Sequence, residues 1–103
     1  MILSIPIKSI PNQRITTVLN KQNVTIDIVT RGVDLFATVY LGATQIITQA
    51  KCNNSVYLNQ YATTLNGYLY FKTENGLEFN YLELGKNAIL YYADYDVLGV
   101  YND

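Results

Sequence analysis

Hydrophobic and polar positions alternate with a period of two along most of the chain. In residues 24–28, valine and isoleucine alternate with threonine and aspartate, and similar alternation runs through 35–41, 68–73 and 77–82. Successive side chains of a β-strand point to opposite faces, so this period predicts half-buried strands. We expect strands near residues 13–19, 24–30, 35–41, 45–50, 55–58, 68–73, 77–82 and 88–93, with a short one at 97–101.

Turn-forming residues separate these runs at steps of about ten residues, which is typical of an antiparallel sandwich or small barrel. Asn66-Gly67 and Asn75-Gly76 suit tight hairpins, because asparagine and glycine accept positive φ at low cost. Residues 59–65 fit either a loop or one helical turn. The sequence therefore predicts an all-β fold of about 7–9 short strands. Its expected turn residues are Pro11, Asn12, Gln13, Gly32, Asn66, Gly67, Gly76 and Gly85.

The first eleven residues differ from the rest because Pro6 and Pro11 interrupt an apolar run. Proline lacks the backbone donor and keeps the residue before it extended, so sheets tolerate it mainly at edges and strand starts. We expect one domain over 1–103, with 1–11 as an extended arm or edge strand, 12–93 as the core and 94–103 as a tail or short strand.

Composition fits either a well-packed small domain or a subunit whose surface is partly covered by neighbours. Half of the 103 residues are apolar and 15% are charged, where about 25% charged residues is usual. The net charge of −1 indicates no bias of the whole chain toward nucleic acid or membrane. No segment approaches the roughly 20 apolar residues of a membrane helix.

Charge is unevenly divided along the chain. Residues 1–52 hold five basic and two acidic side chains, whereas residues 53–103 hold two basic and six acidic ones. If the fold keeps these halves apart, opposite faces of two copies would attract and could build rings or stacks.

A search for catalytic or ligand-binding residues finds none. The chain has no histidine, which removes Ser-His-Asp systems and most zinc sites. Cys52 is the only cysteine and reads as a small buried apolar residue. Asp94 and Asp96 fit solvated charge better than a cation site, and no glycine-rich phosphate loop is present. We expect no enzyme activity, cofactor or metal.

Tyrosine is in excess, with ten in the chain and nine of them after residue 56. Tyrosine fills half-exposed sheet faces, and it also enriches protein interfaces because it combines a large rigid ring with a polar tip. Tyr91 and Tyr92 must point to opposite faces if 88–93 is a strand. The tyrosines lie in the acidic half, which disfavours contact with a phosphate backbone.

Four segments carry a family resemblance when taken in order. They are "IPIKSIPNQRITTVLNKQNVTIDI", "RGVDLFATVYLGATQIITQAKC", "LNGYLYF" and "LELGKNAILYY", between residues 5 and 93. Together they resemble the small baseplate plug proteins of contractile-tailed phages, a family described from a cyanophage. Similar proteins often have tryptophan in the strand that corresponds to "LFATVYL", and this sequence has none.

The resemblance implies a non-catalytic, all-β structural protein of the virion tail baseplate, assembled in the host cytoplasm. Its implied partners are hub, tube or spike proteins and copies of itself, without a membrane or specific nucleic acid. We further expect the arm to lie along a neighbour or add a strand to its sheet. Deleting residues 1–11 would then leave the monomer folded and stop assembly. The expected interface residues are Ile2, Leu3, Ile5, Ile7, Ile10, Tyr91, Tyr92, Tyr95 and Tyr101.

Two other classes of binding module remain as alternatives. A nucleic-acid-binding barrel of the OB type predicts a basic aromatic groove, whereas here basic and aromatic residues are segregated along the sequence. A carbohydrate-binding module fits tyrosine and an all-β fold, although such faces often use tryptophan. Binding to single-stranded DNA or to a glycan array distinguishes these classes from a structural protein.

Overall fold

A computed structural model describes residues 2–59 and 65–94 of the chain. This part contains seven strands and one short 3₁₀ helix, and every strand pair is antiparallel. The elements are β1 (Ile2–Ile5), β2 (Asn12–Leu19), β3 (Gln22–Arg31), β4 (Asp34–Leu41), β5 (Thr44–Lys51), β6 (Gly67–Thr73), η1 (Tyr81–Glu83) and β7 (Ala88–Asp94).

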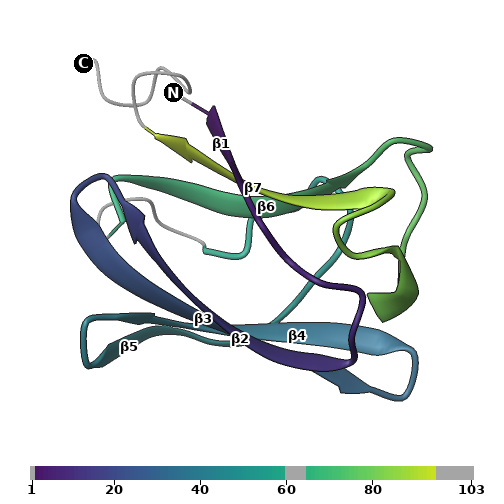
Figure 1. Cartoon of the computed structure of the whole chain (residues 1–103), viewed down its shortest axis with the longest axis horizontal. Coiled ribbons are helices and arrows are strands. Elements are labelled where there is room, and N and C mark those ends of the chain that lie inside the picture. The colour runs from purple at the N-terminus through teal and green to yellow at the C-terminus, as the bar shows by residue number, and fades with distance from the viewer. Residues whose placement is uncertain (1, 60–64, 95–103) are drawn as a thin grey trace.

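The strands form two sheets that face each other (Figure 1). The first sheet has the order β1-β7-β6, and the second has the order β2-β3-β4-β5. Within the described residues the sheets do not close into a barrel. The all-β prediction is therefore confirmed, and of its two forms the sandwich is the one observed.

The core lies between the two sheets and is built from alternate residues of each strand. Val24, Ile26 and Ile28 of β3 are fully buried, and so are Leu69 and Phe71 of β6 in the other sheet. One cluster of buried side chains includes residues from both sheets. The period of two predicted half-buried strands, and the structure shows which alternate residues of β3 and β6 are the buried ones.

Two-residue turns connect the strands of the larger sheet. Asn20 and Lys21 both have positive φ, 51° and 65°, as the type I′ turn between β2 and β3 requires. Gly32 and Gly42 supply the positive φ in the next two turns. Asn66 has a φ of 58° just before β6. A side chain at Gly67 would collide with the backbone carbonyl of Ala93.

Two predicted strands are not formed. Residues 53–59 make only isolated bridges to β6, because Ser55 has a φ of 61° that breaks a regular strand. Residues 77–82 run into η1 instead, where the Asn80 side chain accepts from the Leu82 N–H and the Glu83 carboxylate accepts from the Asn80 N–H. This reciprocal cap begins a helical turn and overrides the alternating pattern. Gly76, with a φ of 73°, precedes this segment without leading into a strand.

The N-terminal segment lies on its own domain in this structure. β1 is the edge strand beside β7, and residues 6–11 then cross to the other sheet, where β2 begins (Figure 1). Ile5 is 3% exposed. Of the features expected in the tail, the strand at 97–101, Tyr95, Asp96 and Tyr101 lie outside the described residues.

Candidate interface on the outer face of the three-stranded sheet

Four tyrosines from three segments form a continuous cluster, called here the tyrosine patch: Tyr57, Tyr68, Tyr70 and Tyr91. The rings of Tyr57 and Tyr68 are stacked, with centroids 4.2 Å apart. Tyr57 meets Tyr70 edge to face at 5.8 Å, and Tyr70 stacks on Tyr91 at 5.6 Å. Such ring pairs stabilise by about 0.5–1.5 kcal/mol beyond the area they bury.

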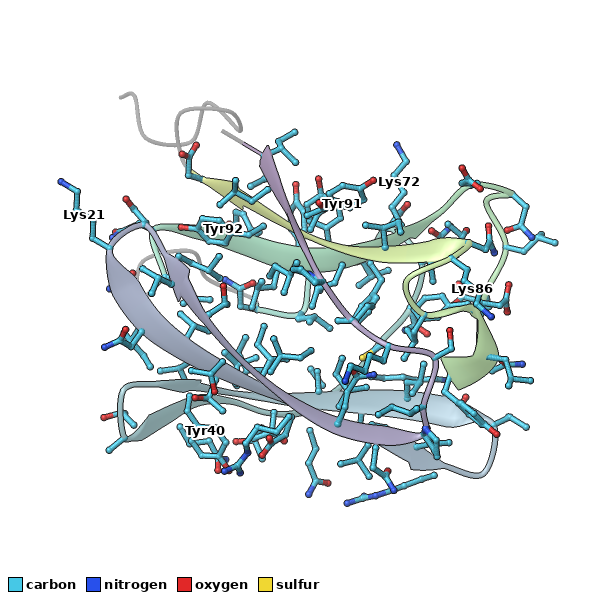
Figure 2. The ribbon with its side chains drawn as sticks, in the orientation of Figure 1. Lys21, Tyr40, Lys72, Lys86, Tyr91 and Tyr92 are labelled. Carbon is cyan, nitrogen blue, oxygen red and sulfur yellow. The ribbon has the colours of Figure 1, made fainter. Side chains whose placement is uncertain are left out.

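Strand register explains why these side chains meet. Tyr70 lies directly opposite Tyr91 in the β6–β7 pair, and Tyr57 is bridged to Tyr70 from the other side. Tyr68 precedes Tyr70 by two residues, so it shares the same face. Leu69 and Phe71, on the opposite face, are fully buried. The tyrosine patch is therefore on the outer face, and Figure 2 shows Tyr91 and Lys72 on the side away from the larger sheet.

The tyrosine patch is exposed enough to meet a partner. Tyr57 is 46% exposed, its chain neighbour Val56 is 50% exposed, and Ile2 of β1 in the same sheet is 51% exposed. Burial against the neighbouring rings, together with the nearby Tyr57 and Tyr91 hydroxyls, raises the pKa of Tyr70 above its usual value. The face thus presents rigid aromatic area with polar hydroxyl tips, which suits a protein interface.

A second feature is the junction, residues 6–11, where the chain passes from the smaller sheet to the larger one. Gln13 binds Lys8 twice, because its side-chain nitrogen donates to the Lys8 carbonyl at 2.7 Å and its oxygen accepts from the Lys8 N–H at 3.0 Å. The Ser9 hydroxyl donates to the Leu84 carbonyl at 2.7 Å. The Thr30 hydroxyl donates to the Pro11 carbonyl at 2.6 Å. These bonds fix residues 8–11 onto the domain.

Gly85, in the loop between η1 and β7, lies against the backbone of Ile7 in the junction. Its φ is 77°, and a Cβ at this position would lie 2.5 Å from the carbonyl oxygen of Ile7. Of the expected turn residues here, Pro11 lies just before β2 and Gly85 in the loop after η1, whereas Asn12 and Gln13 are the first two residues of β2. In addition, the Asn12 side chain accepts from the Thr30 N–H at 3.1 Å.

Comparison with known protein families gives one match that spans most of the chain. Residues 2–96 match the model of the family described as cyanophage baseplate Pam3 plug gp18. The chain belongs to the cyanophage baseplate plug family. No curated protein matched the sequence.

Membership of the plug family implies a structural role in the tail baseplate of the virion, among other baseplate proteins. The family is structural, and no catalytic role is indicated. Within residues 2–59 and 65–94, no group of three or more Cys, Asp or Glu side chains could hold a metal ion. In the same residues no helix is long and apolar enough to cross a membrane.

The residues expected at an interface divide into exposed and buried sets. Ile2 and Ile10 are exposed, at 51% and 40%, and Tyr91 belongs to the tyrosine patch. Leu3 and Ile7 are half-buried against the core. Ile5 and Tyr92 lie in the interior instead, and the Tyr92 hydroxyl donates to the carbonyl of Leu65. Our interface proposal below therefore omits Ile5 and Tyr92.

Three members of the tyrosine patch were not among the expected interface residues. The alternation of 68–73 placed Tyr68 and Tyr70 on one face, so this part of the signal was present in the sequence. The approach of Tyr57 and the register with Tyr91 depend on the pairing of segments far apart in the chain. Single-sequence patterns contain no information on that pairing.

Proposed function

We propose that this protein is a plug-type component of the phage tail baseplate that uses the tyrosine patch to contact another baseplate protein. The observation that carries the proposal is the patch itself, a cluster of four rings on an exposed sheet face in a member of a baseplate family. Interface centres are enriched in tyrosine and depleted of charge. The partner is a hub, tube or spike component, and the protein acts by assembly without catalysis.

The proposal is tested by changing one tyrosine on each outer face. Tyr57→Asp places a charge in the tyrosine patch at an exposed position. Tyr40→Asp is the matched control, because Tyr40 lies on the outer side of the larger sheet (Figure 2). Each variant replaces the wild-type gene in the phage, and baseplate assembly is measured by electron microscopy and by virus titre.

We expect Tyr57→Asp to lower the yield of complete baseplates by at least tenfold and Tyr40→Asp to leave it near the wild-type level, since a loss of about 1.4 kcal/mol in binding is tenfold in affinity. Circular dichroism of the purified variants confirms that both fold. Normal assembly with Tyr57→Asp, or equal losses with both variants, would show that the patch is not the contact.

The alternative binding modules make different predictions for the isolated chain. An OB-type module would bind single-stranded DNA at low salt, and a carbohydrate module would bind members of a glycan array. We expect neither to bind, because Lys72 is the one basic residue in residues 53–59, β6 and β7, which carry the tyrosine patch, whereas a phosphate backbone requires a basic groove. Specific binding in either assay would contradict the structural role.

A further inference from the structure

The four outer edges of the two sheets differ in how well they are protected. β6 is covered, because the Ser55 and Leu58 N–H groups donate to the Phe71 and Leu69 carbonyls at 2.7 and 2.8 Å. β5 is irregular, with register shifts against β4 and a φ of 43° at Gln49. Bulges and covering segments are the devices by which sheets block pairing with other chains.

The remaining two edges belong to β1 and β2. β1 has four residues and is followed by Pro6, which cannot donate to a ladder. β2 has eight residues in regular register with β3, without a proline or a bulge. Among the described residues β2 is therefore the one long edge strand that lacks these protective devices.

The turn after β2 determines which backbone groups face outward. In a two-residue type I′ hairpin the flanking residues, here Leu19 and Gln22, form a hydrogen-bonded pair. Hydrogen-bonded and non-bonded pairs alternate along an antiparallel ladder, so Thr17, Ile15 and Gln13 bond to β3. The N–H and C=O groups of the alternate residues point to the free edge. These residues are Asn12, Arg14, Thr16 and Val18.

We propose that two copies of this chain pair β2 with β2, antiparallel, about a two-fold axis at Ile15. In this register Arg14 of one copy lies opposite Thr16 of the other, and Asn12 lies opposite Val18. Every outward N–H and C=O of the four residues then meets a partner, and the two larger sheets join into one. A two-fold interface uses the same surface on both copies, which is the commonest arrangement of homodimers.

The side chains of β2 are self-complementary in this register. Ile15 is half-buried on the core side, and it gains the Ile15 of the other copy as its neighbour. Val18 is 60% exposed and lies beside Asn12 of the other copy. Cross-strand pairs of this kind stabilise sheets, whereas like charges placed directly opposite destabilise them.

Charge also permits the pairing of two copies. Arg14 is the only charged residue of β2. Its guanidinium bonds both carboxylate oxygens of Asp27 on its own chain, at 2.6 and 2.8 Å. In the proposed register Arg14 faces a threonine, so no like charges oppose each other. This inference does not rest on the proposed function, because the tyrosine patch is on the other sheet and stays free.

The first measurement is the mass of the full-length protein in solution by sedimentation equilibrium. We expect it to rise with concentration from 11.7 kDa toward twice that value. A mass of one chain at every concentration up to the millimolar range would overturn the proposal.

The second measurement locates the axis by cysteine cross-linking. Ile15→Cys places two thiols at a non-hydrogen-bonded pair, where Cα atoms are about 4.5 Å apart, within the range of a disulfide. Thr17→Cys is the matched control, because Thr17 faces Gln13 of the other copy. The native Cys52 is 4% exposed and stays in both variants. On mild oxidation we expect a disulfide-linked dimer of the Ile15→Cys variant and none of the Thr17→Cys variant. The register would be overturned if the two variants cross-linked equally or if neither cross-linked.

The third measurement tests which backbone N–H groups of β2 point to the free edge. Thr16→Pro removes an N–H that faces the free edge, so we expect the melting temperature of the monomer to be retained and the dimer to be lost. Thr17→Pro removes an N–H that bonds to β3 and should lower the melting temperature. Dimerisation of a folded Thr16→Pro variant at the wild-type level would overturn the proposal. If Thr16→Pro fails to fold, the cysteine pair still decides it.

Discussion

Burial and hydrogen bonding together determine the properties of individual side chains in this protein. Cys52 is 4% exposed, and burial raises the pKa of its thiol to about 12. Asp27 is at the surface, and its hydrogen bonds to Arg14 lower the pKa of its carboxyl. Tyr92 fills the core, while its neighbour Tyr91 stacks on Tyr70 outside. Adjacent residues of one strand therefore have different roles.

Cys52 should not react with a thiol reagent such as Ellman's reagent while the protein is folded. The thiolate is the reactive form, and a pKa of about 12 leaves almost none of it near neutral pH. Unfolding in urea should make the thiol react at the rate of a free cysteine. Rapid reaction of the native protein would contradict the buried placement.

Tyr70 should ionise at higher pH than an ordinary tyrosine, in a titration followed by ultraviolet absorbance. Its pKa is raised mainly by burial, then by the Tyr57 and Tyr91 hydroxyls. Because the folded state holds this proton more tightly, the free energy of unfolding should fall as pH rises above about 10. Tyr70→Phe should remove both the late absorbance step and this part of the pH dependence. An unchanged titration curve in the variant would refute the assignment.

The elements are held in place by a few side-chain caps and close backbone contacts. The 3₁₀ turn η1 depends on the capping box of Asn80 and Glu83. The segment between β1 and β2 is fixed by the Gln13, Ser9 and Thr30 bonds. β1 is therefore part of the fold in this structure, and its contribution to stability can be measured directly.

Ile5→Ala should lower the free energy of unfolding in urea by about 2–5 kcal/mol, because it removes a buried side chain between β1 and the core. Ile2→Ala on the same strand should change it by less than about 0.5 kcal/mol, since Ile2 is 51% exposed. Equal effects would mean that β1 does not pack as described.

The packing of β1 also changes what we expect from deleting residues 1–11. The sequence predicted that the monomer would stay folded, and we now expect the deletion to destabilise it.

Gly85→Ala should destabilise the protein more than Gly42→Ala. Both positions have positive φ, which costs a residue with a side chain about 1–2 kcal/mol. At Gly85 the added Cβ would also meet the Ile7 carbonyl at 2.5 Å, whereas nothing lies within 4 Å at Gly42. Urea unfolding of the two variants measures the difference. A smaller loss at Gly85 would show that the junction can move aside at little cost.

At the scale of the whole molecule, two sheets share one core, and the two halves of the sequence that build them differ in charge balance. Residues 12–51, which form the larger sheet and its turns, hold four basic and two acidic side chains, whereas residues 53–59 and 65–94 hold two basic and four acidic ones. Most of these acidic side chains lie in η1 and in the loops beside the smaller sheet, because its strands carry only Lys72 and Asp94. Attraction between these two parts of different copies remains a prediction that salt dependence of assembly would test.

Phe71→Ala should lower the free energy of unfolding by about 3–5 kcal/mol while the transition stays single and cooperative. Phe71 is fully buried and packs against Phe79 with ring centroids 5.2 Å apart, inside the cluster that joins both sheets. Phe36→Ala is the control on the outer side of the larger sheet and should cost less. Two separate transitions would show that the sheets unfold independently.

The sequence by itself determined the fold class, most strands and which residues of β3, β4 and β6 share a face. It did so because a strand's side chains alternate and because asparagine and glycine accept the positive φ of tight turns. The alternation misled at 77–82, where hydrogen bonds between Asn80 and Glu83 prevailed. The family followed from the order of four segments, and the match over residues 2–96 confirmed it.

Only the tertiary structure decided which face of each strand packs against the other sheet and which sheet edges stay open. The sequence placed Tyr91 and Tyr92 on opposite faces, but the packing of the second sheet determined that Tyr92 lies inside. Pairing of distant segments brought Tyr57 onto Tyr68 and left β2 at an edge. Period-two patterns are local, whereas register and sheet order arise from contacts between segments far apart in the chain, so only the folded arrangement reveals them.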